Sequence, residues 1–308
     1  MTEPHDINDP QQGDAIRLSV IIINLNTRDF LHACLTSMKE CIARDDFEVI
    51  LVDNGSTDDS VDMVRRDFPR VRVLPQGRNL GFTRANNIGL MQAKGQYLLV
   101  LNSDTEMVGN ALGQMCDYMD AHPDVGALGS QLLNNDGSVQ LSCRSFPSFK
   151  TVLFHRYSLM TRLFPRNRYS AEYLLTNSTH GETMDVDWVS GACLLTRRET
   201  TAQVGLLDEG FFIYAEDVDW CYRMKQAGWR IVYFPNAKVL HHIGRATSKI
   251  PYRMIYERHR SMWRFYRKHY SKGIVLIDVA TWLGVVTRCG LTMARSFIQR
   301  MIQRESRA

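Results

Sequence analysis

The sequence has few of the features that mark secreted, metal-stapled or repetitive proteins. Its 7 cysteines are odd in number and form no C-x-x-C pair, so neither a disulfide framework nor a structural zinc site is expected and a reducing cytosol is favoured. No internal repeat or signal peptide is visible, and the polar start, residues 1–17, is expected to form a disordered tail. The net charge of +4 is too small to indicate nucleic-acid binding by itself.

The chain does contain a regular alternation of apolar runs and helical patterns. Runs rich in Val, Ile and Leu predict strands at 18–23, 47–52, 71–74 and 97–101, and helical periodicity predicts helices at 30–38, 60–68 and 83–93. This alternation predicts an α/β domain of three layers with a mostly parallel sheet. A dinucleotide-binding oxidoreductase would share it but needs a G-x-G-x-x-G turn after the first strand, where Asn24-Leu25-Asn26-Thr27 stands instead.

Polar residues recur where the predicted strands end. Asp53-Asn54-Gly55 follows the second strand, Asn102-Ser103-Asp104 follows the fourth, and the Asn- and Gly-rich segment 79–87 opens a helix between them. Ordinary turn chemistry explains each loop taken alone. Because ligands of such sheets bind at the carboxyl ends of the strands, the recurrence predicts a binding site there.

An acidic pair stands among aromatic residues at the start of a later predicted helix, in the segment 211–223. Burial beside Phe and Tyr would raise the pKa of Glu216 or Asp217, which is how a carboxylate becomes a general base near neutral pH. The alternative is that the pair caps the helix that follows.

Between these features the pattern is less regular. A short strand is predicted at 124–129, a hairpin-like turn at 134–138, and a strand at 186–196 whose Ser-Gly-Ala centre lets another group approach the backbone. Residues 143–184 have no sustained period, which favours a lid or an acceptor loop.

Together these segments resemble family 2 of the inverting nucleotide-sugar glycosyltransferases, which have the GT-A fold. The resemblance covers 18–247 and rests on motifs in a fixed order: 19–24, 52–58, 79–87, 101–104, 188–192, Glu216-Asp217 and His241. The rhamnosyltransferase-like members that build O-antigen and related cell-envelope glycans are nearer still, and Arg144-Ser145-Phe146-Pro147-Ser148 adds to that similarity.

The resemblance implies roles for individual residues on the donor side. The residues implied in nucleotide-sugar binding are Ile23, Leu25, Asp53, Gly55, Arg84, Asn86, Asn102 and Ser103. Asp104 and His241 are implied as ligands of a divalent metal, Mg²⁺ or Mn²⁺, that bridges the diphosphate. Asn102 departs from the D-x-D motif of the family, which weakens the metal inference, and both His241 and His242 can instead be histidines without a ligand role.

The family also implies the catalytic and acceptor residues. Asp217 corresponds to the base that removes a proton from an acceptor hydroxyl, which then attacks the anomeric carbon and inverts its configuration. Glu216 is expected to orient the site, and Trp188, Ser190, Gly191 and Ala192 are expected to line the acceptor side.

The last segment, 248–308, is expected to be a basic and amphipathic helical extension. Residues 252–272 interleave aromatic with basic residues, and 274–298 is mostly apolar with one polar helix face. Asp278 and Arg288 interrupt the apolar run, so a helix in the membrane interface is favoured over a spanning one. The alternatives are packing on the catalytic domain or on a second subunit; nucleic acid is disfavoured because no such motif is present.

The sequence therefore predicts a cytosolic, membrane-peripheral glycosyltransferase that moves rhamnose from dTDP-rhamnose to a lipid-linked saccharide. Other donors, such as UDP-galactose or UDP-N-acetylglucosamine, would share the same base-binding loop. A processive polysaccharide synthase is disfavoured because no Q-x-x-R-W motif is found. A catalytically idle nucleotide-sugar-binding subunit stays open because of Asn102.

Overall fold

The structure is a computed structural model, and it describes residues 16–147, 180–242 and 251–305. The strands are β1 Leu18–Asn24, β2 Phe47–Asp53, β3 Arg72–Pro75, β4 Tyr97–Asn102, β5 Thr105–Met107, β6 Val125–Leu133, β7 Cys143–Arg144, β8 Met184–Asp185, β9 Trp188–Val189, β10 Cys193–Arg197 and β11 Arg230–His241. The helices are α1 Arg28–Ser37, α2 Lys39–Ile42, α3 Ser60–Asp67, α4 Phe82–Gln92, α5 Ala111–Ala121, α9 Arg198–Val204, α10 Glu216–Gln226, α11 Pro251–His269 and α12 Val275–Glu305.

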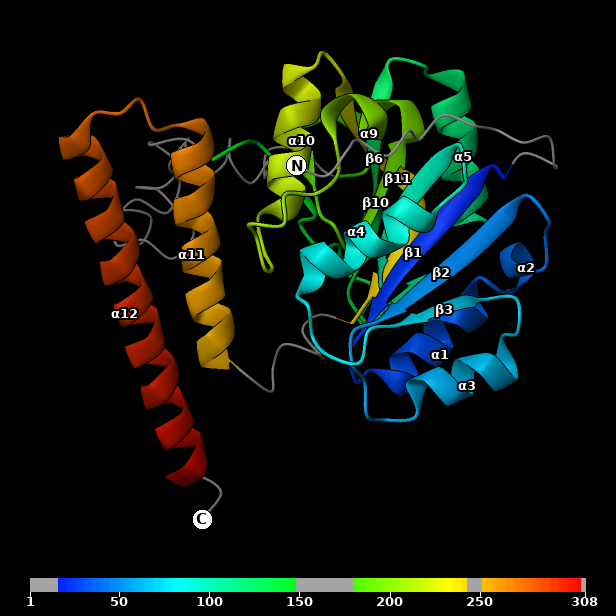
Figure 1. The fold of residues 1–308 in the computed structure, drawn as a ribbon, viewed down its shortest axis with the longest axis horizontal. Helices are drawn as coiled ribbons and strands as arrows, with labels where there is room; N and C mark the ends of the chain where they lie inside the picture. The colour runs from blue at the N-terminus through cyan, green and yellow to red at the C-terminus, as the bar shows by residue number, and fades with distance from the viewer. Residues whose placement is uncertain (1–15, 148–179, 243–250, 306–308) are drawn as a thin grey trace.

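A nine-stranded sheet forms the centre of the molecule, in the order β3-β2-β1-β4-β10-β6-β11-β5 with β8 paired to β11 (Figure 1). The first four strands in this order are parallel to one another. Their register places Asn24 opposite Asp53 and Ile23 opposite Asn102, so the polar ends of β1, β2 and β4 meet at one edge. The strands and helices predicted in this half are confirmed.

The other half of the sheet contains strands of both directions. Strand β10 is antiparallel to both β4 and β6, and β11 is parallel to β6 but antiparallel to β5 and β8. The sheet is therefore mixed but mostly parallel, as predicted: β3, β2, β1, β4, β6 and β11 run in one direction, and β10, β5 and β8 run in the other. The strand predicted at 186–196 is two strands, β9 and β10, separated at Ser190-Gly191-Ala192.

Two further segments in this half extend the prediction. Helix α5 was not predicted, and β6 continues to Leu133, beyond the predicted end of its strand. The turn at 134–138 is present, with the Asn134 N–H donating to the Ser138 carbonyl over 2.8 Å. Residues 148–179, most of the predicted lid or acceptor loop, lie outside the described residues.

The sheet is buried on both faces, which explains why its strands are continuous apolar runs in the sequence. Val20 and Ile22 belong to a core cluster shared with α1 and α5. Ile21 and Ile23 point the opposite way, into a second cluster shared with α4 and α10. The three predicted layers are therefore present.

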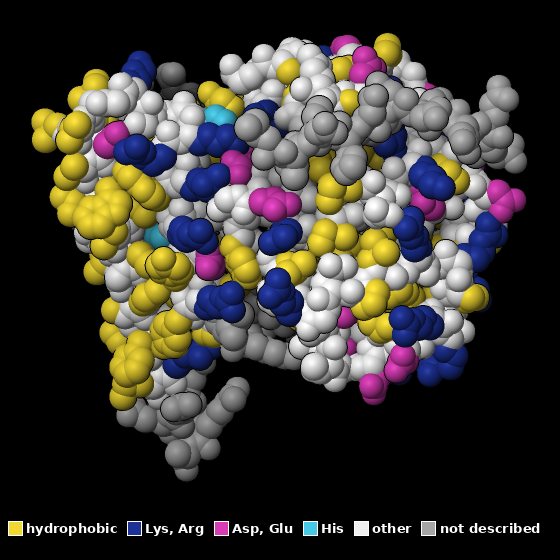
Figure 2. Space-filling view, viewed as in Figure 1, with side chains coloured by type: hydrophobic (Ala, Val, Ile, Leu, Met, Phe, Trp, Pro, Cys, Tyr) yellow, Lys and Arg dark blue, Asp and Glu magenta, His cyan; other side chains and the backbone are white. Residues whose placement is uncertain are grey.

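The C-terminal helices α11 and α12 lie side by side, antiparallel, at the edge of the molecule (Figure 1). Their junction is fixed by Asp278, which accepts hydrogen bonds from the Tyr266 hydroxyl over 2.7 Å and from the Ser271 hydroxyl over 2.8 Å. Helix α12 begins one residue after the start of the helix predicted at 274–298 and continues beyond its predicted end. Most of its apolar side chains are exposed, and Figure 2 shows them along one edge of the molecule: Val275, Leu276, Ile277, Val279, Trp282, Leu283, Val286, Leu291, Phe297, Ile298, Met301 and Ile302.

Candidate active site

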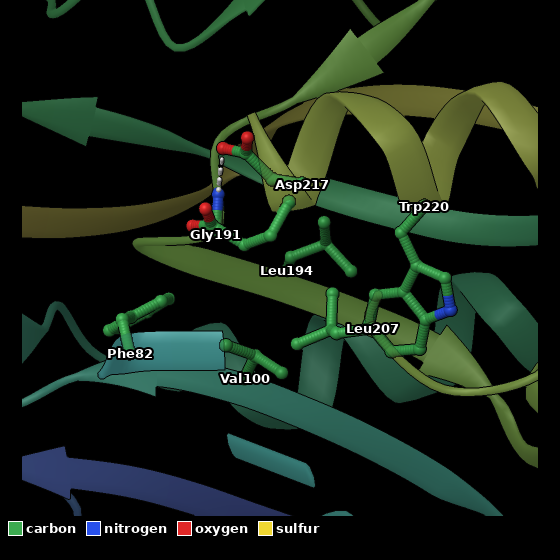
Figure 3. Close-up of a pocket in the computed structure, with 8 residues that line it drawn as sticks. Phe82, Val100, Gly191, Leu194, Leu207, Asp217 and Trp220 are labelled. Carbon is green, nitrogen blue, oxygen red and sulfur yellow. Dashed lines mark hydrogen bonds between the residues drawn. The ribbon is translucent and has the colours of Figure 1, made fainter. Parts of the chain in front are cut away.

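A strained turn presents the acidic pair at the start of α10. Tyr214 and Ala215 both have left-handed backbone conformations, with φ of 70° and 63°, and such residues cost about 1–3 kcal/mol each. The turn leads directly into Glu216 and Asp217. The Oδ2 atom of Asp217 accepts the Gly191 N–H over 3.0 Å (Figure 3), and its Oδ1 accepts the N–H of the next residue over 2.9 Å.

The two carboxyl groups are held in different states by their surroundings. Burial raises the pKa of Glu216 well above its usual range, and the charge of Asp217 raises it further. Burial also raises the pKa of Asp217, but the N–H groups of Gly191 and Val218 oppose the shift. Within the described residues the Oε2 atom of Glu216 has no hydrogen-bond partner. Asp217 is therefore the group of the pair that ionises more readily, and Glu216 is the group that keeps its proton.

The capping alternative accounts for only part of this geometry. The N-cap position of α10 is Ala215, which provides no side-chain hydrogen bond to the helix. Asp217 does accept one N–H of the first turn, but its other oxygen is directed across to Gly191. The acidic pair thus joins two segments that are separate in sequence.

A small pocket opens beside this pair. Its wall is mostly apolar and comes from α4, β4, β10, the segment before α10 and α10 itself (Figure 3): Phe82, Val100, Gly191, Leu194, Leu207, Glu216, Asp217 and Trp220. An apolar wall around a carboxylate sustains the raised pKa that a general base needs.

The ends of β1 and β2 carry the residues expected to bind the nucleotide. Asp53 is 3% exposed. Its Oδ1 accepts from the Asn24 amide and its Oδ2 from the Ser56 N–H, each over 3.0 Å. Ionised carboxylate oxygens accept further bonds, so Asp53 is fixed in place while keeping acceptor capacity. Ile23 is buried and Leu25 half-buried beside it.

Two residues shape the loops around Asp53. Gly55 has φ of +89°, and a Cβ there would lie 2.8 Å from the Cα of Arg78, so only glycine fits this turn. Asn54 accepts the Leu80 N–H over 2.8 Å and donates to the Gly81 carbonyl over 3.3 Å. Sequence analysis did not assign Asn54 a role, although it stands beside Asp53.

The residues expected on α4 differ in their surroundings. Asn86 is buried and donates to the Phe82 carbonyl over 3.0 Å, whereas its Oδ1 has no partner in the described part of the chain. Arg84 is exposed, with its Nε 3.9 Å from Glu209 Oε2. Arg84 is therefore free to move toward a ligand and Asn86 is not.

The end of β4 meets the end of β11. The His241 Nε2 lies 3.5 Å from Asp104 Oδ1 and 3.4 Å from the amide nitrogen of Asn102. The Ser103 hydroxyl contacts that of Thr27 over 2.8 Å. His242 instead bonds to Glu106 over 2.7 Å, which leaves His241 as the histidine beside Asp104.

Gln140, which sequence analysis missed, orients His241. The Gln140 amide nitrogen donates to the carbonyls of Leu133 and His241, so its Oε1 faces the ring and accepts the His241 Nδ1 proton over 2.9 Å. This leaves the Nε2 lone pair beside Asp104, the arrangement in which histidine binds a metal. Within the described residues no three His, Cys, Asp or Glu side chains form a metal-binding group. The donor types of Asp104 and His241 fit a divalent ion, but its remaining ligands would have to come from phosphate oxygens or water.

The residues expected at the acceptor side connect these parts. The Ala192 carbonyl accepts the Asn102 N–H over 3.0 Å, and the neighbouring Gly191 holds Asp217. The Ser190 N–H donates to the Ser142 carbonyl. The Trp188 indole N–H donates to the carbonyl of Ser145, which stands shortly before residues 148–179 in the chain. The break between β9 and β10 therefore links the Asp104 end of β4 to the acidic pair.

Comparison with known proteins decides the family. The family model described as "Glycosyl transferase family 2" matches residues 19–185. The chain belongs to this family. It is a glycosyltransferase, and the residues assembled at the strand ends lie on the side of the sheet where enzymes of this α/β type bind ligands.

Relatives of this glycosyltransferase include several named for rhamnose transfer. It is 33% identical to an N-acetylglucosaminyl-diphospho-decaprenol L-rhamnosyltransferase of Mycobacterium tuberculosis, over 82% of this chain and 85% of that protein. It is 24% identical to the dTDP-rhamnosyl transferase RfbF of Shigella flexneri, over 71% of this chain and 67% of that protein. A mannosyltransferase of Pyrobaculum calidifontis, solved with GDP-Man and Mn²⁺, shares the GT-A fold, with a TM-score of 0.56 at 17% identity over 92% of this chain and 80% of that one.

Proposed function

We propose that this glycosyltransferase moves L-rhamnose from dTDP-rhamnose, with inversion, to a saccharide linked to polyprenyl diphosphate during cell-envelope polysaccharide synthesis. The observation that carries the proposal is the Asp217 carboxylate, held by the Gly191 N–H at the wall of the pocket with a raised pKa. The choice of sugar and acceptor draws on the names of the relatives, a rhamnosyltransferase of a decaprenol-linked substrate and a dTDP-rhamnosyl transferase.

In the proposed reaction Asp217 takes the proton of an acceptor hydroxyl. The hydroxyl oxygen forms a bond to the anomeric carbon as the bond to the nucleoside diphosphate breaks on the opposite face, which inverts the configuration. Glu216 keeps its proton and so spares the site a second negative charge. The enzyme mainly aligns two substrates, and alignment alone can supply several kcal/mol, about 7–11 in favourable cases.

The donor is proposed to bind along the ends of β1, β2 and β4. Asp53 would accept from the edge of the pyrimidine base, which packs on Ile23 and Leu25 above the turn at Gly55. Arg84, Asn86, Asn102 and Ser103 would line the rest of the nucleotide-sugar. A Mg²⁺ or Mn²⁺ ion held by Asp104 and His241 would supply positive charge to the diphosphate leaving group.

Helix α12 is proposed to attach the enzyme to the inner face of the cytoplasmic membrane. Residues 275–302 are long and apolar enough to cross a membrane, and 6% of their most apolar stretch is buried in the structure. Asp278 is bound by Tyr266, Ser271 and Arg267, so this charge faces α11. We favour a helix lying in the interface because Arg288 still interrupts the apolar run. A spanning helix and a second subunit packed on α12 are the alternatives.

A nucleotide-sugar panel tests the proposed function. The purified enzyme would be mixed with dTDP-rhamnose, UDP-galactose, UDP-N-acetylglucosamine and GDP-mannose, each with Mn²⁺, Mg²⁺ or EDTA, and its thermal stability and donor hydrolysis measured. We expect stabilisation and metal-dependent hydrolysis with dTDP-rhamnose. Preference for another donor would overturn the sugar assignment, and binding without turnover in the presence of acceptor would favour an idle subunit.

A further inference from the structure

We infer that Arg253 and Arg258 on α11 form the site that binds the diphosphate group of the lipid-linked acceptor. This inference rests on the proposed function, because it assigns a location to the charged part of the proposed acceptor. It concerns the helix that joins the catalytic part of the enzyme to α12.

The basic residues of α11 fall into two groups. Those nearer its C-terminal end are paired with carboxylates: Arg260 with Glu257 at 3.1 Å, Arg264 with Asp208 at 2.8 Å, Arg267 with Asp278 at 3.3 Å, and Lys268 with Asp208 and Asp219 at 2.7 Å. In the part of the chain that the structure describes, neither Arg253 nor Arg258 has a carboxylate partner. Within the described residues, two guanidinium groups thus stand on the first turns of the helix without a compensating carboxylate.

These two arginines contact the segment that leads to the catalytic base. The Cζ atom of Arg253 lies 4.9 Å from the ring centroid of Phe212, and that of Arg258 lies 4.8 Å from the ring centroid of Tyr214. Between them, the Ser261 hydroxyl donates to the Ile213 carbonyl over 2.9 Å. The segment continues through the strained turn into Glu216 and Asp217. The arginines are therefore placed within a few residues of the group that activates the acceptor.

Their contacts leave the arginines ready to bind an anion. A guanidinium group that lies over an aromatic ring uses its face, while its N–H donors remain in its plane. Arginine binds phosphate oxygens through pairs of such donors. Two arginines that contact the same short segment, 212–214, match the two phosphate groups of a diphosphate better than a single charge.

The position of α12 beside α11 fits an acceptor that carries a lipid chain. Figure 2 shows basic side chains gathered over α11, between the apolar edge formed by α12 and the catalytic part of the molecule. An acceptor of this class has an apolar chain that stays in the membrane and a sugar that must reach Asp217. Its diphosphate joins the two and so must lie between them, where Arg253 and Arg258 stand. An anionic lipid headgroup carries the same phosphate chemistry, and the experiment separates the two sources.

The test compares Arg253→Gln, Arg258→Gln and the double variant with a matched control. Lys272→Gln is the control, because it removes one positive charge from the same helical hairpin, where, among the described residues, Lys272 forms no hydrogen bond or ion pair with the segment 208–217. Binding of farnesyl diphosphate and of farnesol would be measured in neutral detergent micelles. The KM for a prenyl-diphosphate-linked N-acetylglucosamine would be measured alongside, with donor hydrolysis as a second readout.

We expect farnesyl diphosphate to bind the wild type and farnesol to bind much more weakly. Each single variant should weaken farnesyl diphosphate binding about tenfold and raise the acceptor KM by a similar factor, as the loss of a charged hydrogen bond implies. The KM for the donor and the rate of donor hydrolysis should not change, and Lys272→Gln should behave as the wild type.

Other outcomes would overturn the inference. If the double variant keeps the acceptor KM of an active wild type, the arginines do not bind the acceptor and the proposed function still stands. If it loses binding to phosphatidylglycerol vesicles but not to farnesyl diphosphate, the arginines bind headgroups. If the wild type turns over no donor, the proposed function is wrong. If the wild type and the double variant then bind farnesyl diphosphate equally, the arginines do not form an anion site either.

Discussion

The backbone N–H of Gly191 donates a hydrogen bond to the Oδ2 of Asp217 over 3.0 Å. This contact joins the start of α10 to the break between β9 and β10, two segments that sequence analysis assigned separately to the catalytic base and to the acceptor wall. A Cβ at position 191 would lie 3.5 Å from the Cβ of Asp217, an ordinary contact. The hydrogen bond therefore depends on the position of the backbone and not on the absence of a side chain.

The first prediction concerns which carboxyl group acts as the base. Asp217→Asn should lower the transfer rate by about 10²–10⁴, the usual contribution of a general base, while donor affinity stays nearly unchanged. Glu216→Gln should keep most of the activity at neutral pH, because a protonated Glu216 and a glutamine are both neutral. Initial rates and donor titrations of both variants would check this. Substantial activity in Asp217→Asn, or its loss in Glu216→Gln alone, would reverse the assignment.

The raised pKa of Glu216 has a consequence for stability. A carboxyl group whose pKa is higher in the folded than in the unfolded state stabilises the fold at pH values below the unfolded pKa. This contribution disappears as the pH rises through the folded pKa, because the buried group must then ionise or the protein unfold. Glu216→Gln removes the titrating group. The free energy of unfolding of this variant should therefore increase relative to that of the wild type as the pH rises from about 4 to 8.

Denaturant unfolding at pH 5 and pH 8 would measure this difference. Glu40→Gln on α2 serves as the control. It replaces a carboxylate that is exposed to solvent, so it should change the free energy of unfolding little at either pH. A difference between Glu216→Gln and the wild type that does not grow with pH would contradict the raised pKa.

Much of the parallel half of the fold could be predicted from the sequence, because its strands and helices follow from patterns of neighbouring residues. Each run such as 18–23 is buried on both faces and ends in a polar loop, so Asp53 and Asn102 could be placed at one edge of the sheet. The site residues on this edge belong to segments where periodicity and turn chemistry agree.

The remainder depends on long-range contacts that periodicity does not record. The antiparallel direction of β10 and the break at Ser190-Gly191-Ala192 arise because this segment packs between β4, β6 and α10. Gln140 belongs to no motif, and only the fold brings it to His241. The pattern of basic residues in α11 likewise does not show that Arg264 and Lys268 hold Asp208 and Asp219.

Gln140 leads to a prediction about metal binding. Its contact fixes the ring of His241, and loss of such a partner typically weakens metal affinity 10–100-fold. Gln140→Ala should therefore raise the Mn²⁺ concentration for half-maximal activity at least tenfold, with a smaller effect on the rate at saturating metal. Metal titrations of donor hydrolysis would measure this, with the exposed Gln114→Ala on α5 as the control. An unchanged Mn²⁺ requirement would remove His241 from the proposed metal site.

The last prediction concerns α12. Its exposed apolar face, including Leu276, Trp282 and Leu291, should favour a membrane, since burial of apolar surface contributes about 25 cal/mol per Å². The chain ended after Lys272 should be released from phosphatidylglycerol vesicles in a flotation assay while it keeps donor hydrolysis. Release of the full chain from membranes by alkaline carbonate would agree with an interfacial helix, and retention would indicate a spanning one. If the full chain does not bind vesicles, but light scattering shows that it is a dimer and that the truncated chain is a monomer, the apolar face packs on a second subunit.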